Sequence, residues 1–97
     1  MKSQDVIKEV ESYLYGQSNC RKNWYVGITA YPEKRLFLDH NVKSFSSGYK
    51  CWDCGSDTIA RFVEKHFIEK GCDGGSGGGD RNSRYFYVYR KTAKTLP

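Results

Sequence analysis

Two short runs rich in aromatic and β-branched residues constrain the fold of this chain more than any other feature. They are "NWYVGIT", residues 23–29, and "RYFYVYR", residues 84–90. Residues of these types favour strands, and a strand this short cannot bury its face alone, so we expect both runs in one small sheet. Gly27, inside the first run, indicates either a bulge or a close approach of another backbone.

The N-terminal segment allows two interpretations. Residues 4–15 place apolar side chains on one face at helical spacing, and Gly16 follows as a stop signal, so we predict a first helix. Ser3 is a candidate N-cap for this helix. Residues 10–15 also alternate as a strand does, which would make residues 1–20 part of a hairpin with the run that follows.

Two further helices are predicted downstream. Pro32 suits the first position of a helix that follows the first aromatic run. Residues 56–71, "SDTIARFVEKHFIEKG", combine an N-cap, an apolar stripe and a terminal glycine, as a complete helix does. Residues 44–55 are typical of a loop or a short irregular strand, and residues 73–80 of a glycine-rich loop.

This order of elements predicts a single α+β domain over residues 1–97, with a small antiparallel or mixed sheet flanked by helices. A chain of 97 residues buries roughly two-thirds of its unfolded surface, which is enough for one core. No apolar run approaches the ~20 residues that cross a bilayer, and the N-terminal residues lack the hydrophobic stretch of a signal peptide. We therefore expect a cytoplasmic protein with no membrane partner.

The chain carries an excess of basic residues. Its net charge is +5, which favours a polyanionic partner such as nucleic acid. Exposed tyrosines near these residues would add stacking to the electrostatic attraction. The basic residues expected to form such a surface are Arg21, Lys22, Arg81, Arg84, Arg90, Lys91 and Lys94.

The chain has four cysteines, two of which form the motif "CWDC". Thiols stay reduced in the cytoplasm, so a disulfide framework is not predicted. The two-residue spacing of Cys51 and Cys54 lets both thiolates reach one structural Zn²⁺, completed by Cys20, Cys72 or His66. The alternative is a set of ordinary buried or half-exposed cysteines, since no second close pair is present.

Three residues with charged or titratable side chains are candidates for chemistry. Arg35 and His40 follow the first aromatic run, but a separation of five residues is about 500° of helical rotation, so we predict that they share no face of an α-helix. His40 would then join a common site only from the frayed end of the helix. Glu64 lies at the edge of the apolar stripe of the last predicted helix, either as a rim residue paired with Arg61 or Lys65, or as an oxygen ligand of Mg²⁺.

Taken together, these residues resemble the GIY-YIG nuclease family. The stretch "YVGIT", an arginine eight residues after its glycine, a histidine, and the helix "ARFVEKHFIEKG" are similar to the second signature of that family and to its arginine, histidine and metal-binding glutamate. The resemblance spans about residues 23–90 and includes the closing run "YFYVYR". It implies a small endonuclease that hydrolyses DNA phosphodiester bonds with Mg²⁺ or Mn²⁺.

The resemblance also implies a role for each matching residue. Tyr25 corresponds to the tyrosine of the second signature, and Gly27 to its glycine, which lets the strand pack close to the site. Arg35 would stabilise charge on the phosphoryl oxygens, and His40 would act on water as the general base. Glu64 would hold the metal ion that polarises the scissile phosphate.

The first signature of the family, Gly-Ile-Tyr, is absent as written. Tyr13 has eleven residues between it and Tyr25, so it is the candidate for the other catalytic tyrosine if residues 10–15 form a strand. If they form a helix, one tyrosine and one strand of the expected site are missing, and the alternative function is a catalytically inactive module that binds nucleic acid or a protein partner. The candidates for contact with nucleic acid, besides Gly27, are Arg81, Asn82, Arg84 and Lys91.

Overall fold

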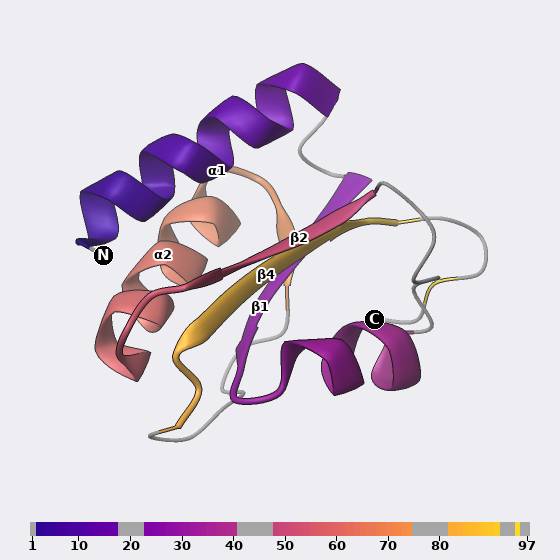
Figure 1. The fold of residues 1–97 in the computed structure, drawn as a ribbon. Helices are drawn as coiled ribbons and strands as arrows, with labels where there is room; N and C mark the ends of the chain where they lie inside the picture. Colours follow the sequence, from indigo (N-terminus) through magenta and orange to yellow (C-terminus); the bar gives the residue numbers. More distant parts are fainter. Residues whose placement is uncertain (1, 18–22, 41–47, 75–81, 92–94, 96–97) are drawn as a thin grey trace.

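The computed structural model of the chain describes residues 2–17, 23–40, 48–74, 82–91 and 95, and every structural statement below concerns these residues (Figure 1). Within them the chain forms two α-helices, one short π-helix and four strands. In chain order these are α1 (Ser3–Gln17), β1 (Trp24–Thr29), η2 (Lys34–Asp39), β2 (Tyr49–Asp53), α2 (Asp57–Glu69), β3 (Asp73–Gly74) and β4 (Tyr85–Arg90).

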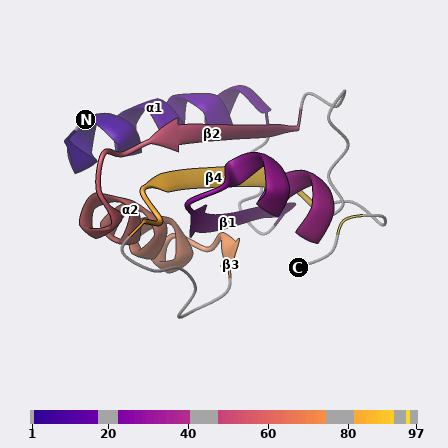
Figure 2. The same ribbon diagram turned by 60° about the horizontal axis from the view of Figure 1, so that its bottom comes forward.

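The strands form a mixed sheet in the order β2-β4-β1-β3 (Figure 2). β1 and β4 pair antiparallel along their whole length, which confirms that both aromatic runs share a sheet. β2 pairs antiparallel with the other side of β4, and β3 adds to β1 as a parallel strand of two residues. The expected α+β class, with a mixed sheet flanked by helices, is therefore observed.

One face of the sheet is apolar and is covered by α1 and α2, which lie on the same side of it in Figure 1. Alternate residues of β1 and β4, such as Val26 and Val88, point to this face because successive side chains of a strand point to opposite sides. The buried residues of this core are Val6, Val10, Leu14, Trp24, Val26, Ile28, Trp52, Cys54, Ala60, Val63, Phe67, Cys72, Phe86 and Val88.

The opposite face of the sheet carries tyrosines and is covered by η2. Tyr25, Tyr87 and Tyr89 alternate with the core residues along β1 and β4, and they form a second buried cluster with Leu36 of η2. In Figure 1, η2 lies across the sheet from α1 and α2. The strand-to-helix unit that carries the candidate catalytic residues therefore builds a layer separate from the main core.

The N-terminal segment is a helix, so the alternative of a strand at residues 10–15 is wrong. The carbonyl of Lys2 accepts the first helical hydrogen bonds, which places Ser3 inside the helix rather than at the N-cap. The helix also continues through Gly16 to Gln17. The helix forms rather than the strand because its period of 3.6 residues brings three apolar side chains onto one buried face, those of Val6, Val10 and Leu14.

The helix after β1 contains a turn that is wider than an α-helical turn. The backbone N–H of Arg35 donates to the Tyr31 carbonyl at 3.0 Å, as in an α-helix, whereas the N–H of His40 donates at 3.0 Å to the carbonyl of Arg35, five residues back. The predicted rotation of about 500° between Arg35 and His40 assumed α-helical turns, and the last turn of this helix does not follow that geometry. His40 is the C-cap residue of η2, which confirms its expected place at the helix end.

The second half of the chain differs from expectation in two places. Residues 49–53, expected to be a loop or a short irregular strand, form a regular strand at the edge of the sheet, because β4 offers them a complete antiparallel partner. The start of the glycine-rich segment pairs as β3, and residues 75–80 lie outside the described residues. α2 agrees with its prediction: the Ser56 hydroxyl caps it by accepting from the Ile59 N–H at 3.2 Å.

A search of the described residues for membrane-spanning helices gives a negative result. None of the helices there has the length and apolarity needed to cross a bilayer.

Candidate active site

The hydroxyl of Tyr87 is the centre of a polar cluster between η2 and the sheet. His40 Nε2 lies 2.8 Å from this hydroxyl oxygen, and Arg35 Nε donates a hydrogen bond to it at 3.3 Å. Tyr87 belongs to β4, whereas Arg35 and His40 come from η2 and its C-terminal end. The wide turn of η2 is the local feature that lets two residues five apart in sequence reach the same hydroxyl.

His40 is fully buried in this cluster and uses both ring nitrogens. Its Nδ1 lies 3.1 Å from the hydroxyl oxygen of Tyr89. Since a neutral imidazole has one donor and one acceptor nitrogen, one of the two tyrosine hydroxyls accepts a hydrogen bond from His40 and the other donates one to it. The imidazole thus has hydroxyl partners in place of water.

The ring of Tyr25 completes the cluster. It stacks on Tyr89 with ring centroids 5.1 Å apart, and it lies 4.8 Å from the imidazole of His40. Three of the residues predicted from the sequence, Tyr25, Arg35 and His40, are therefore brought together. Of the cluster's members, only Arg35 is half-exposed, so its guanidinium is the part that a ligand meets first.

Gly27 makes room for the side chain of Tyr87. The two residues pair across β1 and β4, and a Cβ atom added to Gly27 would overlap the Tyr87 hydroxyl and lie 2.5 Å from Cζ. The register of the two strands is continuous through this pair, so the bulge considered for this position is not formed. The close approach at Gly27 is made by an aromatic side chain rather than by a backbone.

Burial and nearby charges set the ionisation of Tyr87. Loss of solvent raises its pKa to about 12, against the opposing effect of the hydrogen bond and charge of Arg35. The negative charge of Glu64 adds to the rise in the Tyr87 pKa, so the carboxylate on α2 acts electrostatically on the cluster. Burial also raises the pKa of Glu64, against the opposing charge of Arg61.

Glu64, the metal ligand expected from the sequence, is half-buried on α2. Arg61, which the rim interpretation paired with Glu64, forms an ion pair with Asp57 at 3.3 Å, and its positive charge also opposes the rise in the Glu64 pKa. Hydrated Mg²⁺ keeps most of its waters and takes one or two carboxylates together with substrate phosphates. The described part of the chain contains no group of three or more His, Cys, Asp or Glu residues that could hold a metal ion.

Tyr13 does not join the cluster. Its ring packs edge-on against Trp24 and Trp52, with centroids 5.7 and 6.0 Å apart. Both tryptophans belong to the apolar core, so the sheet separates Tyr13 from Tyr87. The catalytic role considered for Tyr13 required a strand at residues 10–15, and a helix is formed instead.

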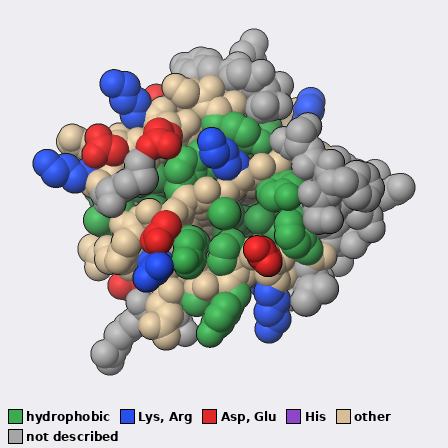
Figure 3. Space-filling view, in the orientation of Figure 1, with side chains coloured by type: hydrophobic (Ala, Val, Ile, Leu, Met, Phe, Trp, Pro, Cys, Tyr) green, Lys and Arg blue, Asp and Glu red, His purple; other side chains and the backbone are tan. Residues whose placement is uncertain are grey.

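The residues predicted to contact nucleic acid include two that are paired with carboxylates. Arg84 Nη2 lies 3.0 Å from Asp53, and Lys91 Nζ lies 3.0 Å from Asp73. Asn82 is exposed. On the described part of the face in Figure 3, basic side chains are interspersed with acidic ones around a band of hydrophobic side chains. The predicted basic residues that lie outside the described residues are Arg21, Lys22, Arg81 and Lys94.

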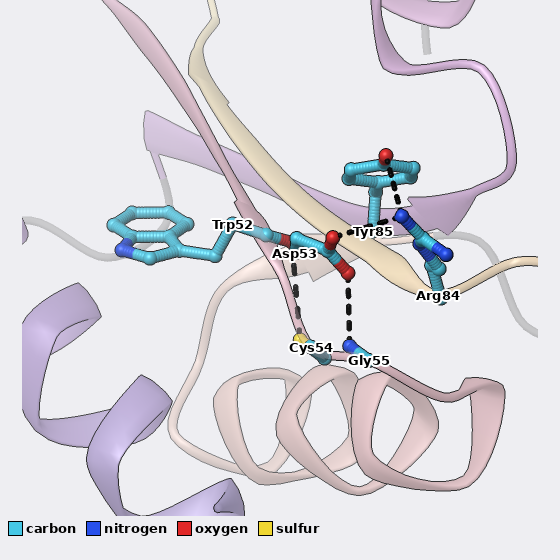
Figure 4. A network of polar contacts seen from close by, with 6 residues as sticks. All are labelled: Trp52, Asp53, Cys54, Gly55, Arg84 and Tyr85. Carbon is cyan, nitrogen blue, oxygen red and sulfur yellow. Dashed lines mark hydrogen bonds and ion pairs between the residues drawn. The ribbon is translucent and has the colours of Figure 1, made fainter. Parts of the chain in front are cut away.

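Cys51 and Cys54, the pair considered for zinc, lie in different environments. Cys51 is exposed on β2 and pairs with Tyr87 on the tyrosine face, whereas Cys54 is buried in the apolar core. The Cys54 thiol donates a weak hydrogen bond to the Trp52 carbonyl at 3.9 Å (Figure 4). Cys72 is also in the core, and Cys20 lies outside the described residues. The exposed Cys51 thus lies apart from the core that contains Cys54 and Cys72.

Two residues of the cluster, Tyr87 and Tyr89, do not emerge from the sequence analysis. Their signal is present in "YFYVYR", where three tyrosines alternate and therefore share one face of a strand. These tyrosines become part of a site only because β4 pairs with β1, which places Tyr87 opposite Gly27. The sequence does not specify that pairing.

Comparison of the chain with family models, with curated proteins and with solved structures gives no match. The functional assignment therefore rests on the residues of the cluster and on their geometry.

Proposed function

We propose that this chain is a small metal-dependent endonuclease, similar to the GIY-YIG nucleases, that hydrolyses phosphodiester bonds in DNA. The observation that carries the proposal is the meeting of Arg35 and His40 at the Tyr87 hydroxyl, beside the ring of Tyr25. The family resemblance implies a tyrosine, an arginine and a histidine at one site, and here they come from a single strand-to-helix unit. Tyr87 takes the place of the other tyrosine, for which Tyr13 was the sequence candidate.

In this proposal Arg35 binds the scissile phosphate. Its guanidinium is permanently charged and planar, so it can stabilise the charge that builds on the phosphoryl oxygens as water attacks. Its hydrogen bond to Tyr87 fixes the side chain before the substrate arrives. The half-exposed position of Arg35 at the border of a buried cluster suits contact with a polymer that remains on the surface.

Tyr87 and His40 would move the proton of the attacking water. Water attacks phosphorus in line, and the bond from phosphorus to the leaving oxygen breaks. The Tyr87 oxygen accepts the water proton while its own proton passes to His40 Nε2, across the 2.8 Å contact. The leaving oxygen is then protonated by solvent. Since the pKa of Tyr87 is raised to about 12, the tyrosine stays protonated at neutral pH and needs His40 as the proton acceptor.

Glu64 would hold one Mg²⁺ or Mn²⁺ ion. When bound, such a cation polarises the scissile phosphate and assists departure of the leaving oxygen. The half-buried position of Glu64 on a helix supports this role, because a ligand on a rigid element keeps its orientation.

Cleavage of labelled DNA with and without Mg²⁺ tests the proposal. Glu64→Gln should abolish Mg²⁺-dependent cleavage, because an amide cannot supply the negative charge that a hard cation needs. Glu69→Gln, an exposed position of the same helix, is the matched control and should cleave as the wild type does. Both variants should keep the wild-type circular dichroism spectrum. Wild-type protein that cleaves no DNA with any divalent cation would overturn the proposal.

A second function is favoured by the burial of the same cluster. Tyr25, His40 and Tyr87 are all buried, and a fully satisfied polar cluster also serves to hold a sheet and a helix together. The chain would then be a nucleic-acid-binding or protein-interaction module without catalytic activity. This function predicts salt-sensitive binding that survives Glu64→Gln, together with absence of cleavage by the wild type.

A further inference from the structure

A second aromatic surface lies beside the candidate active site, around Tyr31 and Tyr85. Tyr31 is 71% exposed, although it is a large aromatic residue, and it stands between two hollows. One hollow has a volume of about 510 Å³ and is lined by Pro32 and Lys34, and the other, of about 430 Å³, by polar residues that include Arg84. Tyr31 and Tyr85 line both hollows, and we refer to this region as the Tyr31–Tyr85 surface.

The guanidinium of Arg84, on this surface, is held in a defined position. Asp53 accepts a hydrogen bond from the Gly55 N–H at 2.9 Å with one carboxylate oxygen, and from Arg84 Nη2 at 3.0 Å with the other (Figure 4). The guanidinium carbon of Arg84 lies 5.2 Å from the ring centroid of Tyr85, and Nη2 also donates to the Tyr85 hydroxyl at 3.3 Å. A positive charge and an aromatic ring are thus fixed side by side.

The surface is continuous with the candidate active site. Tyr85 and Tyr87 are two residues apart on β4 and point to the same face, which separates them by about 7 Å along the strand. On the other side, the Tyr31 carbonyl accepts the hydrogen bond from the Arg35 N–H at 3.0 Å. A nucleotide next to the phosphate held by Arg35 would therefore reach Tyr31.

We propose that the Tyr31–Tyr85 surface binds an unpaired nucleotide of the DNA substrate, with its base stacked on Tyr31 and its phosphate paired with Arg84. Base-on-aromatic stacking needs a free base face, which a base inside a duplex does not offer because both its faces are stacked on neighbours. The exposed ring, the ordered guanidinium and the net charge of +5 fit a single strand. The adjacency to cleavage rests on the function proposed above, whereas the binding itself does not.

The test is fluorescence anisotropy with labelled oligothymidylate and with a duplex of equal length, in EDTA so that no cleavage occurs. Tyr31→Ala should weaken binding of the single strand about tenfold, because one stacked base is lost, while duplex binding changes little. Tyr31→Phe should bind as the wild type does, since stacking needs the ring and not the hydroxyl. Arg84→Gln should lower the slope of log K against log salt by about 0.7 for the single strand, as expected for one phosphate contact.

Phe62→Ala is the matched control, because Phe62 on α2 is 58% exposed but lines neither hollow. It should leave binding of the single strand unchanged. The inference would be overturned if the wild type did not bind the single strand, or if Tyr31→Ala and Phe62→Ala weakened that binding equally. It would also be overturned if Tyr31→Ala lowered the affinity for single strand and duplex by the same factor.

The two proposals fail separately. Cleavage by the wild type with no effect of Tyr31→Ala on single-strand binding would remove the surface and leave the nuclease. Tyr31-dependent binding by a protein that never cleaves DNA would remove the nuclease and leave the surface.

Discussion

His40 Nε2 and the hydroxyl oxygen of Tyr87 lie 2.8 Å apart, although 47 residues separate the two positions in the chain. Both groups are buried, so each provides the hydrogen-bond partner that the other would otherwise lose on leaving water. The contact joins the end of η2 to an inner strand of the sheet. It belongs to the candidate active site and also stabilises the fold, and these two contributions can be measured separately.

The stabilising contribution is tested by Tyr87→Phe. Loss of the hydroxyl leaves a buried imidazole nitrogen of His40 without its partner, which should lower the free energy of unfolding by about 1–3 kcal/mol. Tyr31→Phe removes a hydroxyl of the same kind from an exposed ring and should change stability by less than about 0.5 kcal/mol. Urea denaturation followed by circular dichroism measures both, and equal stability of the two variants would contradict a structural role for the contact.

The tight fit at Gly27 predicts that replacing this glycine by alanine lowers the free energy of unfolding, the opposite of the usual effect in a strand. Gly27→Ala in a strand would ordinarily stabilise by about 0.5–1 kcal/mol, because glycine loses more backbone entropy on folding. Here the new Cβ would overlap the Tyr87 ring, which hydrogen bonds to Arg35 and His40 hold in place, so we expect a net loss of about 1–3 kcal/mol.

A double-mutant cycle identifies the cause of that loss. In a Tyr87→Leu background the ring and hydroxyl are gone, so Gly27→Ala should then cost little or should stabilise. A cost of Gly27→Ala that is the same in both backgrounds would show that another neighbour is responsible.

The raised pKa of Tyr87 predicts how stability changes at high pH. Its pKa is about 12 in the folded protein against an ordinary tyrosine value of 10.0, so the folded state binds this proton more tightly than the unfolded state. The associated stability is fully present below pH 10 and is lost as pH rises through 12, by roughly 2–3 kcal/mol in total. Urea denaturation across this range should show a smaller fall for Tyr87→Phe than for the wild type, and an identical fall would contradict the raised pKa.

The proposed role of Arg35 predicts a rate effect larger than the binding effect. Arg35→Ala should slow single-turnover DNA cleavage by roughly a hundredfold, because a group aimed at charge in the transition state is lost. DNA affinity should fall less, since many basic side chains share the phosphate contacts. Arg35→Lys keeps the positive charge but loses the planar guanidinium, so its cleavage rate should lie between those of the wild type and Arg35→Ala. A loss of affinity as large as the loss of rate would assign Arg35 to binding alone.

The cysteine environments predict selective modification. Cys51 is an exposed residue and should react with a thiol reagent in the folded protein. It should react more slowly than a free thiol, because partial burial of its sulfur and the negative charge of Glu33 raise its pKa. Cys54 and Cys72 are buried and should react only after unfolding. Peptide mapping by mass spectrometry measures each site.

Protein purified without chelator should contain less than about one zinc per chain, and stoichiometric zinc with protection of Cys51 would support the zinc site instead.

The features of this protein that could be predicted from the sequence are those with a local cause. The apolar stripe of residues 56–71 and the Ser56 cap specify α2 because side chains four residues apart meet on a helix surface. The two aromatic runs specify strands because their residues fit a pleated, half-buried surface. Arg35, His40 and Tyr25 are recognisable for the same reason, since they lie within one short unit of the chain.

Other features could not be predicted, because they depend on which distant segments become neighbours in the folded chain. Pairing of β4 with β1 places Tyr87 opposite Gly27, and no local pattern near either residue specifies that pairing. The wide turn of η2 is a second example: α-helical rotation keeps Arg35 and His40 apart, and contacts of both side chains with Tyr87 accompany the π-turn that brings them together. Long-range contacts override local preference here because the hydrogen bonds and burial gained at Tyr87 exceed the small differences between one helical turn and another.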